Sequence, residues 1–349
     1  MANFNYGDYG MVNLIPAFEM LPSNNFLLQN LNIFDKQGSA DITVAYDRIA
    51  NANRVLLNTP KKRFSMEHDS IQRGDSKLYN IEIPYFHNEN TASSADIQRG
   101  IRKAGTNQAE TMDQIVFNYM RDQSIAHKTA VEESYARCLF KGEIESPYTP
   151  QGPIIKYTDM FDAPMMTDTV DLTTGGTLDV IQQFNEWLDR ISEATQGLYS
   201  RIRRVVVFAG VTAFSQLQYH QSLRDAFKYV NPNDPRNIVT QRTEILGNVV
   251  TFTLPGLAID VIKVADPSLT KYLEKTEMVM VPVFEQGTNG FVHVFGPASA
   301  DTNLAVSGDV QEVYSYLYEK PRGEREIVSE AGILPINNCT GMTLKITTV

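Results

Sequence analysis

Residues 107–141, NQAETMDQIVFNYMRDQSIAHKTAVEESYARCLFK, decide the fold. Asn107 followed by Glu110 predicts a capping box at the start of a helix, and Gly142 predicts its end. At about 1.5 Å per residue the helix would be roughly 50 Å long, far beyond the mean helix of a globular domain, which predicts a structural spine. The apolar residues recur at a helical period: Met112, Ile115, Val116, Tyr119, Met120, Ala126, Ala130, Val131, Tyr135, Cys138 and Leu139.

Two strand patterns precede this helix. Residues 42–46 and 79–85 alternate apolar and polar side chains, and Pro84 marks an edge strand or the end of a strand. Residues 91–106 are predicted to be a polar connector. A long hairpin with so little core of its own is marginally stable alone, so we expect it to lie against something, such as a partner subunit. The polar segment between the two strands includes Lys61, Lys62 and Arg63.

Residues 1–38 are predicted to form an arm. They mix asparagine with large apolar residues and show no long helical periodicity. Leaving so many apolar side chains in water would be costly, which favours an extended arm packed on another surface, for example a neighbouring subunit. A frayed terminus is the alternative.

The chain after the spine predicts a mixed domain. Short strands are expected near residues 154–157 and 168–172, and a helix over residues 177–196. The continuous apolar run at 205–208 predicts a buried strand, and Gly210 a tight turn into a helix over 212–227. Further strands are expected at 249–254, 258–264, 279–284 and 291–295, and again around 314–318 and 342–346, with a charged segment, 319–326, between the last two.

Composition narrows the class of protein. The 349 residues are 42% hydrophobic, enough for a substantial core, and the net charge of −10 argues against a protein that grips nucleic acid by charge alone. Neither Cys138 nor Cys339 belongs to a CxxC pair, which predicts buried thiols in a reducing compartment. No secretory signal or membrane-length apolar run is visible, so we expect a soluble protein made in a cytoplasm.

Motifs for catalysis are missing from the sequence. It has no GxGxxG, P-loop, HExxH or GxSxG pattern, and its five histidines are not spaced as metal ligands. We therefore predict no catalytic, cofactor-binding or metal-binding residues. Four acidic residues lie in a segment that we interpret as a solvated loop, and a glycosidase-type carboxylate pair is the alternative for them. The four acidic residues are Asp159, Asp162, Asp168 and Asp171.

The order of elements resembles a known family. Several stretches are similar to the lambda gpE-type major capsid proteins of tailed bacteriophages. They are DITVAYD at 41–47, MRDQ at 120–123, LFKG at 139–142, VVVF at 205–208 and YLYEKPRGEREIVSE at 316–330, which is followed by Leu334 and Pro335. The resemblance covers essentially the whole chain and implies an α+β protein with the Hong Kong 97-type capsid fold. Its parts would be an N-terminal arm (1–39), an E-loop hairpin and connector (40–104), a P-domain with the spine helix (105–175), an A-domain (176–310) and a C-terminal return to the P-domain (311–349).

The resemblance also implies a function. The chain would self-assemble into hexamers and pentamers of an icosahedral shell around double-stranded DNA, with scaffolding and portal proteins, and in some shells a decoration protein, as partners. It implies no enzyme activity, cofactor or membrane contact. Alternating charges on one exposed edge suit contacts between subunits, so the first candidate contact residues are Lys320, Arg322, Glu324, Arg325 and Glu326, with a solvated loop as the alternative. The basic residues of the hairpin, Lys61, Lys62 and Arg63, are the other candidates.

Some capsids of this fold crosslink a lysine of the E-loop to an asparagine of a neighbour's P-domain. The lysines here would be Lys61, Lys62 and Lys77, and the asparagines Asn337 and Asn338. The lambda-type relatives do not generally rely on this bond, so ordinary surface residues are the expectation.

Two other functions stay open at this point. One is a cellular nanocompartment shell of the same fold, which would enclose enzymes in place of DNA. The other is an α/β enzyme of about 39 kDa, which would be a monomer or small oligomer with a polar cleft.

Overall fold

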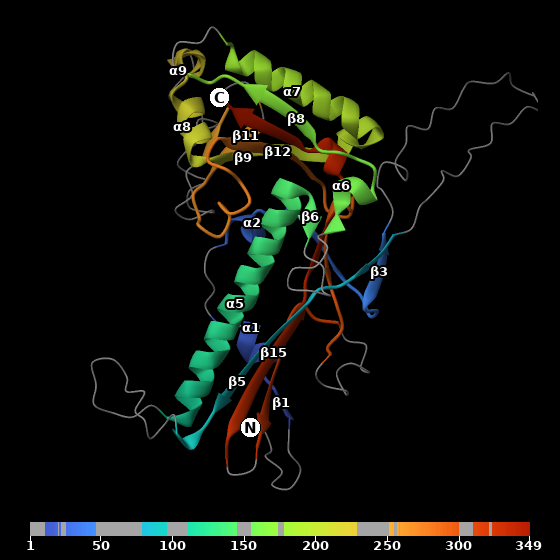
Figure 1. Ribbon diagram of the computed structural model, residues 1–349, viewed down its shortest axis with the longest axis vertical. Coiled ribbons are helices and arrows are strands. Elements are labelled where there is room, and N and C mark those ends of the chain that lie inside the picture. Colours follow the sequence, from blue (N-terminus) through green and yellow to red (C-terminus); the bar gives the residue numbers. More distant parts are fainter. Residues whose placement is uncertain are drawn as a thin grey trace, which may run out of the picture.

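A computed structural model describes residues 11–19, 21, 26–46, 79–95, 111–144, 155–173, 178–228, 251–254, 257, 259–299, 310–320 and 323–349. One long helix, α5 (Met112–Lys141), connects the two ends of the molecule (Figure 1). A six-stranded sheet covered by helices lies at one end of α5, and a four-stranded sheet runs beside the rest of its length. The spine predicted from the sequence is confirmed.

The predicted start of the spine helix is wrong. The N-cap is Thr111, whose side chain accepts a hydrogen bond from the Gln114 backbone N–H, and the Gln114 side chain accepts one from the Thr111 N–H. This reciprocal capping box begins the helix at Met112, five residues later than expected; Asn107 and Glu110 lie outside the described residues. The predicted end is confirmed, because Gly142 takes the left-handed conformation (φ 64°) that glycine adopts without a steric penalty.

The six-stranded sheet forms the core of the upper end in Figure 1. Successive residues of its central strand β9 enter two different apolar clusters: Val205 and Val207 face the helices, whereas Val206 and Phe208 face the end of α5. Both faces are therefore buried, which explains the continuous apolar run. In order across the sheet, the strands are β10 (Thr251–Thr253), β11 (Ile259–Val264), β9 (Ile202–Gly210), β12 (Glu277–Phe284), β17 (Leu344–Thr348) and β8 (Met166–Val170).

Helices α7 (Val180–Thr195), α8 (Val211–Tyr219) and α9 (Gln221–Lys228) cover the outer side of this sheet (Figure 1), and a 3₁₀ helix, Gln196–Arg201, leads into β9. The single helix predicted over 212–227 is wrong. His220 is extended (φ −60°, ψ 138°), and its Nδ1 accepts a hydrogen bond from the Ser222 N–H at 3.4 Å. The ring thus caps a second helix, which a periodic apolar pattern does not reveal.

The lower end is built on an antiparallel sheet of four strands. Their order is β1 (Met11–Asn13), β14 (Tyr314–Glu319), β15 (Arg325–Gly332) and β5 (Tyr85–Ala92). The charged segment expected between strands is therefore the turn and start of a β14–β15 hairpin. A separate sheet joins β16 (Leu334–Asn337), β13 (Phe291–Phe295) and β2 (Asp35–Gly38).

The predicted pairing of two strands before the spine is confirmed. β3 (Thr43–Tyr46) pairs antiparallel with β4 (Tyr79–Glu82), and Pro84 separates β4 from β5. The tip of this hairpin, 47–78, lies outside the described residues. The connector predicted from residue 91 is wrong at its start, because β5 continues to Ala92.

The described part of the arm packs on its own chain. β1 pairs with β14, and α1 (Ile15–Glu19) and α2 (Leu27–Asn30) lie against α5. Leu28 is fully buried, and the Phe34 ring stacks on Tyr135 of the spine at 4.0 Å. The surface that shields these apolar residues is therefore within the subunit, and the expectation of a neighbouring subunit is wrong for them.

Three small elements complete the described chain: β6 (Glu143–Ile144) pairs with β7 (Ile155–Lys156), α6 (Tyr157–Met160) follows, and a 3₁₀ turn spans Thr340–Met342. The five-part division of the chain stays a prediction. The six-stranded sheet takes β8, β9 and β17 from three of the five predicted parts.

Candidate functional site

The surface between α5 and the sheets changes in character along the helix. Near its start, Ile115, Val116 and Met120 belong to an apolar cluster with α1 and the four-stranded sheet. Near its end, residues 135–140 pack in the main core. Between these two sections the buried side chains are polar, namely Gln123, Ser124, His127 and Glu132.

Glu132 holds the arm. Its two carboxylate oxygens accept hydrogen bonds from the backbone N–H groups of Leu28 (2.7 Å) and Gln29 (3.1 Å), at the first turn of α2. The Gln29 side chain donates to Glu132 (3.2 Å) and to the Lys128 carbonyl (2.8 Å). Burial raises the pKa of the Glu132 carboxyl, although the backbone N–H groups oppose this shift. A carboxylate 104 positions away thus serves as the cap of a short helix.

Glu330 is a second buried carboxylate that joins separate segments. It accepts hydrogen bonds from the hydroxyl groups of Tyr85 and Tyr316 and from the Ser299 backbone N–H at 2.9 Å. Burial, together with the hydrogen bond to Glu330, raises the pKa values of both tyrosines, so both stay protonated donors. Glu330 therefore fixes the start of β5 and the segment before residue 300 to the centre of the sheet.

The structure places the predicted charged residues in two groups. Lys61, Lys62, Arg63 and Arg322 lie outside the described residues. The others lie at the β14–β15 turn, where Lys320 pairs with Glu326 (2.6 Å) and Arg325 pairs with Asp113 (2.6 Å) at the start of α5. Glu324 is half-buried beside them. Lys320, Arg325 and Glu326 are thus engaged within the chain, and the sequence pattern did not reveal Asp113 as a partner. Their role between subunits stays a prediction.

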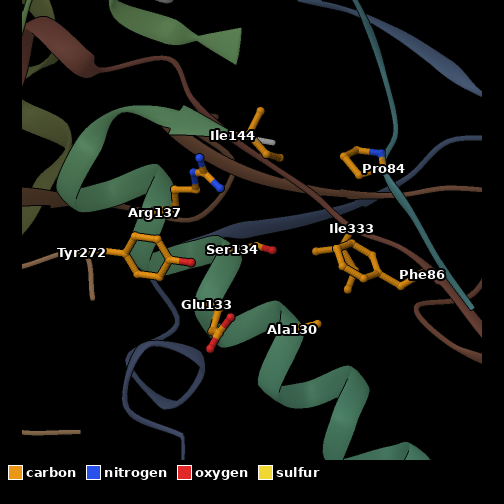
Figure 2. Close-up of a pocket in the computed structure, with 9 residues that line it drawn as sticks. All are labelled: Pro84, Phe86, Ala130, Glu133, Ser134, Arg137, Ile144, Tyr272 and Ile333. Carbon is orange, nitrogen blue, oxygen red and sulfur yellow. The ribbon is translucent and has the colours of Figure 1, made fainter. Parts of the chain in front are cut away.

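A pocket lies beside α5 near the point where β4 ends and β5 begins. Figure 2 shows side chains of the spine helix on one side and, on the other, apolar side chains of β5 and of the β4–β5 and β15–β16 junctions. Glu133 pairs with Lys271 (2.7 Å) and Arg137 with Glu143 (3.3 Å), so the charged groups at the pocket have partners. The lining residues are Pro84, Phe86, Ala130, Glu133, Ser134, Arg137, Ile144, Tyr272 and Ile333.

The described residues contain no group of three or more histidine, cysteine or acidic side chains placed to hold a metal ion. Burial raises the pKa values of both cysteine thiols, which makes them unreactive as nucleophiles. Of the four acidic residues considered for catalysis, Asp168 instead accepts hydrogen bonds from Trp187 (2.7 Å) and Arg190 (2.8 Å). None of the described helices is long and apolar enough to span a bilayer.

Comparison with known proteins identifies the family. The model of the family described as phage major capsid protein E matches residues 10–348. The chain belongs to this family. It is a major capsid protein, the subunit of a phage shell, and the virion shell is where it acts. The family is one of structural proteins.

Solved structures show the same fold. The putative capsid protein of a prophage from E. coli CFT073 gives a TM-score of 0.54 at 14% identity, covering 80% of this chain and 81% of that one. The capsid of cyanophage A-1(L) gives 0.51 at 8% identity, covering 93% and 94%, and that of cyanophage Pam1 gives 0.51 at 9%, covering 99% and 94%. The Hong Kong 97-type capsid fold is therefore confirmed. No curated protein sequence matches the capsid protein significantly.

Proposed function

We propose that this capsid protein assembles into hexamers and pentamers that close an icosahedral shell around double-stranded DNA. The observation that carries the proposal is the family match over residues 10–348 of a chain with the phage capsid fold. Assembly would take place in the host cytoplasm. The net charge of −10 fits a shell that encloses DNA with only loose contact, since charge-driven binding of phosphates needs basic residues.

We propose that the pocket of Figure 2 is a contact between neighbouring subunits. It combines apolar side chains with charged groups that already have partners, so a neighbour could cover it without leaving an unpaired charge. Covering such surface in a shell would remove it from water and stabilise the assembly.

The pocket can be tested with one substitution at two places on α5. Ala130→Arg would place a long charged side chain in the pocket, whereas Ala126→Arg changes an exposed position about one helical turn earlier. We expect the first variant to remain a folded subunit by circular dichroism and to form no shells in electron microscopy. The second variant should form shells as the unaltered protein does. Normal shells from Ala130→Arg would show that the pocket is not a contact.

We propose that the turn between β14 and β15 is a further contact, as the alternating charges predicted. The ion pairs of Lys320 with Glu326 and of Arg325 with Asp113 hold this turn in place before any neighbour binds, which lowers the ordering cost of association. Arg325→Glu should then reduce the yield of shells strongly. If its yield matches that of the unaltered protein, Lys320, Arg322, Glu324, Arg325 and Glu326 have no role between subunits.

Scaffolding and portal proteins, and a decoration protein in some shells, are proposed partners that the family suggests. Lys61, Lys62 and Arg63 are proposed contacts of the E-loop. Purified particles with packaged DNA, obtained only when a scaffolding protein is co-expressed, would support the proposal. Particles that enclose proteins and no DNA would instead indicate a nanocompartment, and a stable monomer under all conditions would contradict assembly.

The lysine–asparagine crosslink is not part of the proposal. Asn337 and Asn338 are buried in the subunit, and the Asn338 amide donates to the Asn289 carbonyl at 2.9 Å. We expect mature particles to give a single band near 39.2 kDa in denaturing electrophoresis. A ladder of larger species would overturn this expectation.

A further inference from the structure

A group of buried polar side chains lies between the middle of α5 and the four-stranded sheet. All of its helix members and both of its serines on the sheet are at most 3% exposed. Apolar clusters flank it at both ends of the helix. We call this group the polar chamber; its members are Asn88, Gln123, Ser124, His127, Ser315 and Ser329.

The members face one another across the helix–sheet surface. Ser315, Ser329 and Asn88 lie opposite one another on three adjacent strands, β14, β15 and β5, so their side chains point to the same face of the sheet. His127 stands over this row, with its Nε2 2.8 Å from the Ser329 hydroxyl and 3.2 Å from the Asn88 amide nitrogen.

The two other helix members lie on the same face of α5 as His127. Gln123 and Ser124 precede it by four and three positions, which places all three side chains together. The Gln123 amide donates to the Asn90 side chain (2.8 Å) and to the Ile327 carbonyl (3.2 Å) of the same sheet.

One ring nitrogen of His127 is engaged and the other is not. Nε2 makes both contacts, with the Ser329 hydroxyl and the Asn88 side chain, whereas Nδ1 has no hydrogen-bond partner among the residues that the structure describes. Burial lowers the pKa of His127 to about 4, so the ring is neutral. Nδ1 of a neutral ring can donate or accept one hydrogen bond.

Four buried atoms of the polar chamber have no hydrogen-bond partner among the residues that the structure describes. They are Nδ1 of His127, Oε1 of Gln123, and the hydroxyls of Ser124 and Ser315. Leaving that many polar groups dry would be costly, since each buried group without a partner is destabilising. Native structures satisfy such groups with ordered water when protein atoms cannot reach them.

We infer that the polar chamber is a binding site for ordered water, which bridges α5 to the four-stranded sheet. Water both donates and accepts, so it can satisfy a ring nitrogen, an amide oxygen and a hydroxyl group alike. The polar chamber holds no carboxylate or thiolate, so water matches the set better than a metal ion. Because hydrogen bonds are directional and apolar packing is not, this water sets how α5 is rotated on the sheet.

Two conservative variants test this inference by the sign of their effect. Ser124→Ala and Ser315→Ala each remove one hydroxyl that has no protein partner and leave the chain otherwise unchanged. If the hydroxyls bind water, each variant should melt roughly 1 to 3 °C below the unaltered subunit, because a satisfied hydrogen bond is lost. If the polar chamber is dry, each alanine removes an unsatisfied group and the melting temperature should rise or stay the same, which would overturn the inference.

A control and a direct observation complete the test. Ser200→Ala, at an exposed position of the 3₁₀ helix, should leave the melting temperature unchanged. A cryo-electron microscopy map of the assembled shell, at a resolution where ordered water is visible, should show density about 3 Å from His127 Nδ1. A map with ordered water elsewhere and no density beside this nitrogen would also overturn the inference.

Discussion

Glu132 is predicted to be the residue that fastens the arm to the spine. Its carboxylate accepts the backbone N–H groups of Leu28 and Gln29 and is 1% exposed. Replacing it by alanine leaves the buried Leu28 N–H and the partly buried Gln29 N–H without an acceptor. Replacing it by glutamine keeps one acceptor oxygen and puts an NH₂ group where the other oxygen was. The alanine variant should therefore have the larger effect.

The size of the effect follows from the lost hydrogen bonds. A hydrogen bond to a charged group contributes about 1.5 to 3 kcal/mol, and an unpaired buried donor costs about 1 to 3 kcal/mol. Burial raises the pKa of Glu132, which shows that burying its charge costs free energy. Part of the free energy of its hydrogen bonds offsets that cost. We expect Glu132→Ala to weaken the attachment of the arm by about 3 kcal/mol and Glu132→Gln by about half as much.

Hydrogen exchange at the Leu28 and Gln29 amides measures this local free energy. If the arm opens without unfolding the core, a loss of about 3 kcal/mol corresponds to roughly a hundredfold faster exchange, and half that loss to about tenfold. Exchange in β9, at the centre of the six-stranded sheet, should not change.

Glu133→Gln is the matched control for this prediction. It removes a carboxylate from the next residue, which pairs with Lys271 on the surface, where an ion pair contributes at most about 1 kcal/mol. Unchanged exchange at Leu28 in Glu132→Ala, or an equal change in Glu133→Gln, would refute the reasoning.

Three further outcomes follow from the same structure. Burial lowers the pKa of His127 to about 4, against 6.5 for an exposed histidine. The neutral ring therefore stabilises the fold fully above pH 6.5, and about 3 kcal/mol of that stability is lost as the pH falls toward 4. Urea denaturation at pH 7 and 4.5 should show that the free energy of unfolding falls less in His127→Asn than in the unaltered protein. An equal fall in both proteins would contradict this. Gly210→Ala should lower the urea midpoint by an amount equivalent to about 3 kcal/mol, because a Cβ there would lie 2.2 Å from the Glu274 carbonyl oxygen. In the control Gly287→Ala the Cβ meets open space, and the loss of stability should be about 1 kcal/mol. Equal urea midpoints for the two variants would be evidence against the clash. Cys138 and Cys339 should react with a thiol reagent only after unfolding, and labelling of the native subunit would show that the core opens.

A long helix and a buried strand were predictable from the sequence. β9 carries a continuous apolar run, and α5 ends at the predicted Gly142 but begins later than predicted. Over its whole length α5 has no single apolar face, because polar side chains are buried in its middle. β5 was largely missed because its sequence is polar. Its Asn88 and Asn90 side chains bond to His127 and Gln123 of the spine, so the reason for their positions lies 33 or more residues away in the chain.

The candidate contacts between subunits were only partly predictable. The alternating charges at 320–326 marked the β14–β15 turn, but the partner of Arg325 is Asp113, and no local pattern joins these two residues. The pocket beside α5 draws on four separate segments, which come together only in the folded chain. No sequence pattern marked Glu132, which is buried against the arm.

The sequence by itself determined the class of this protein and the presence of its long helix. The class follows from the order and spacing of motifs along the chain, and the helix from the apolar spacing in its two end sections and from the glycine that ends it. The tertiary structure alone decided what each face of that helix meets: an apolar sheet at one end, water-binding polar side chains in the middle by our inference, and the arm held by Glu132. Those contacts join residues about 100 to 200 positions apart, so their free energy depends on distances that no local pattern contains.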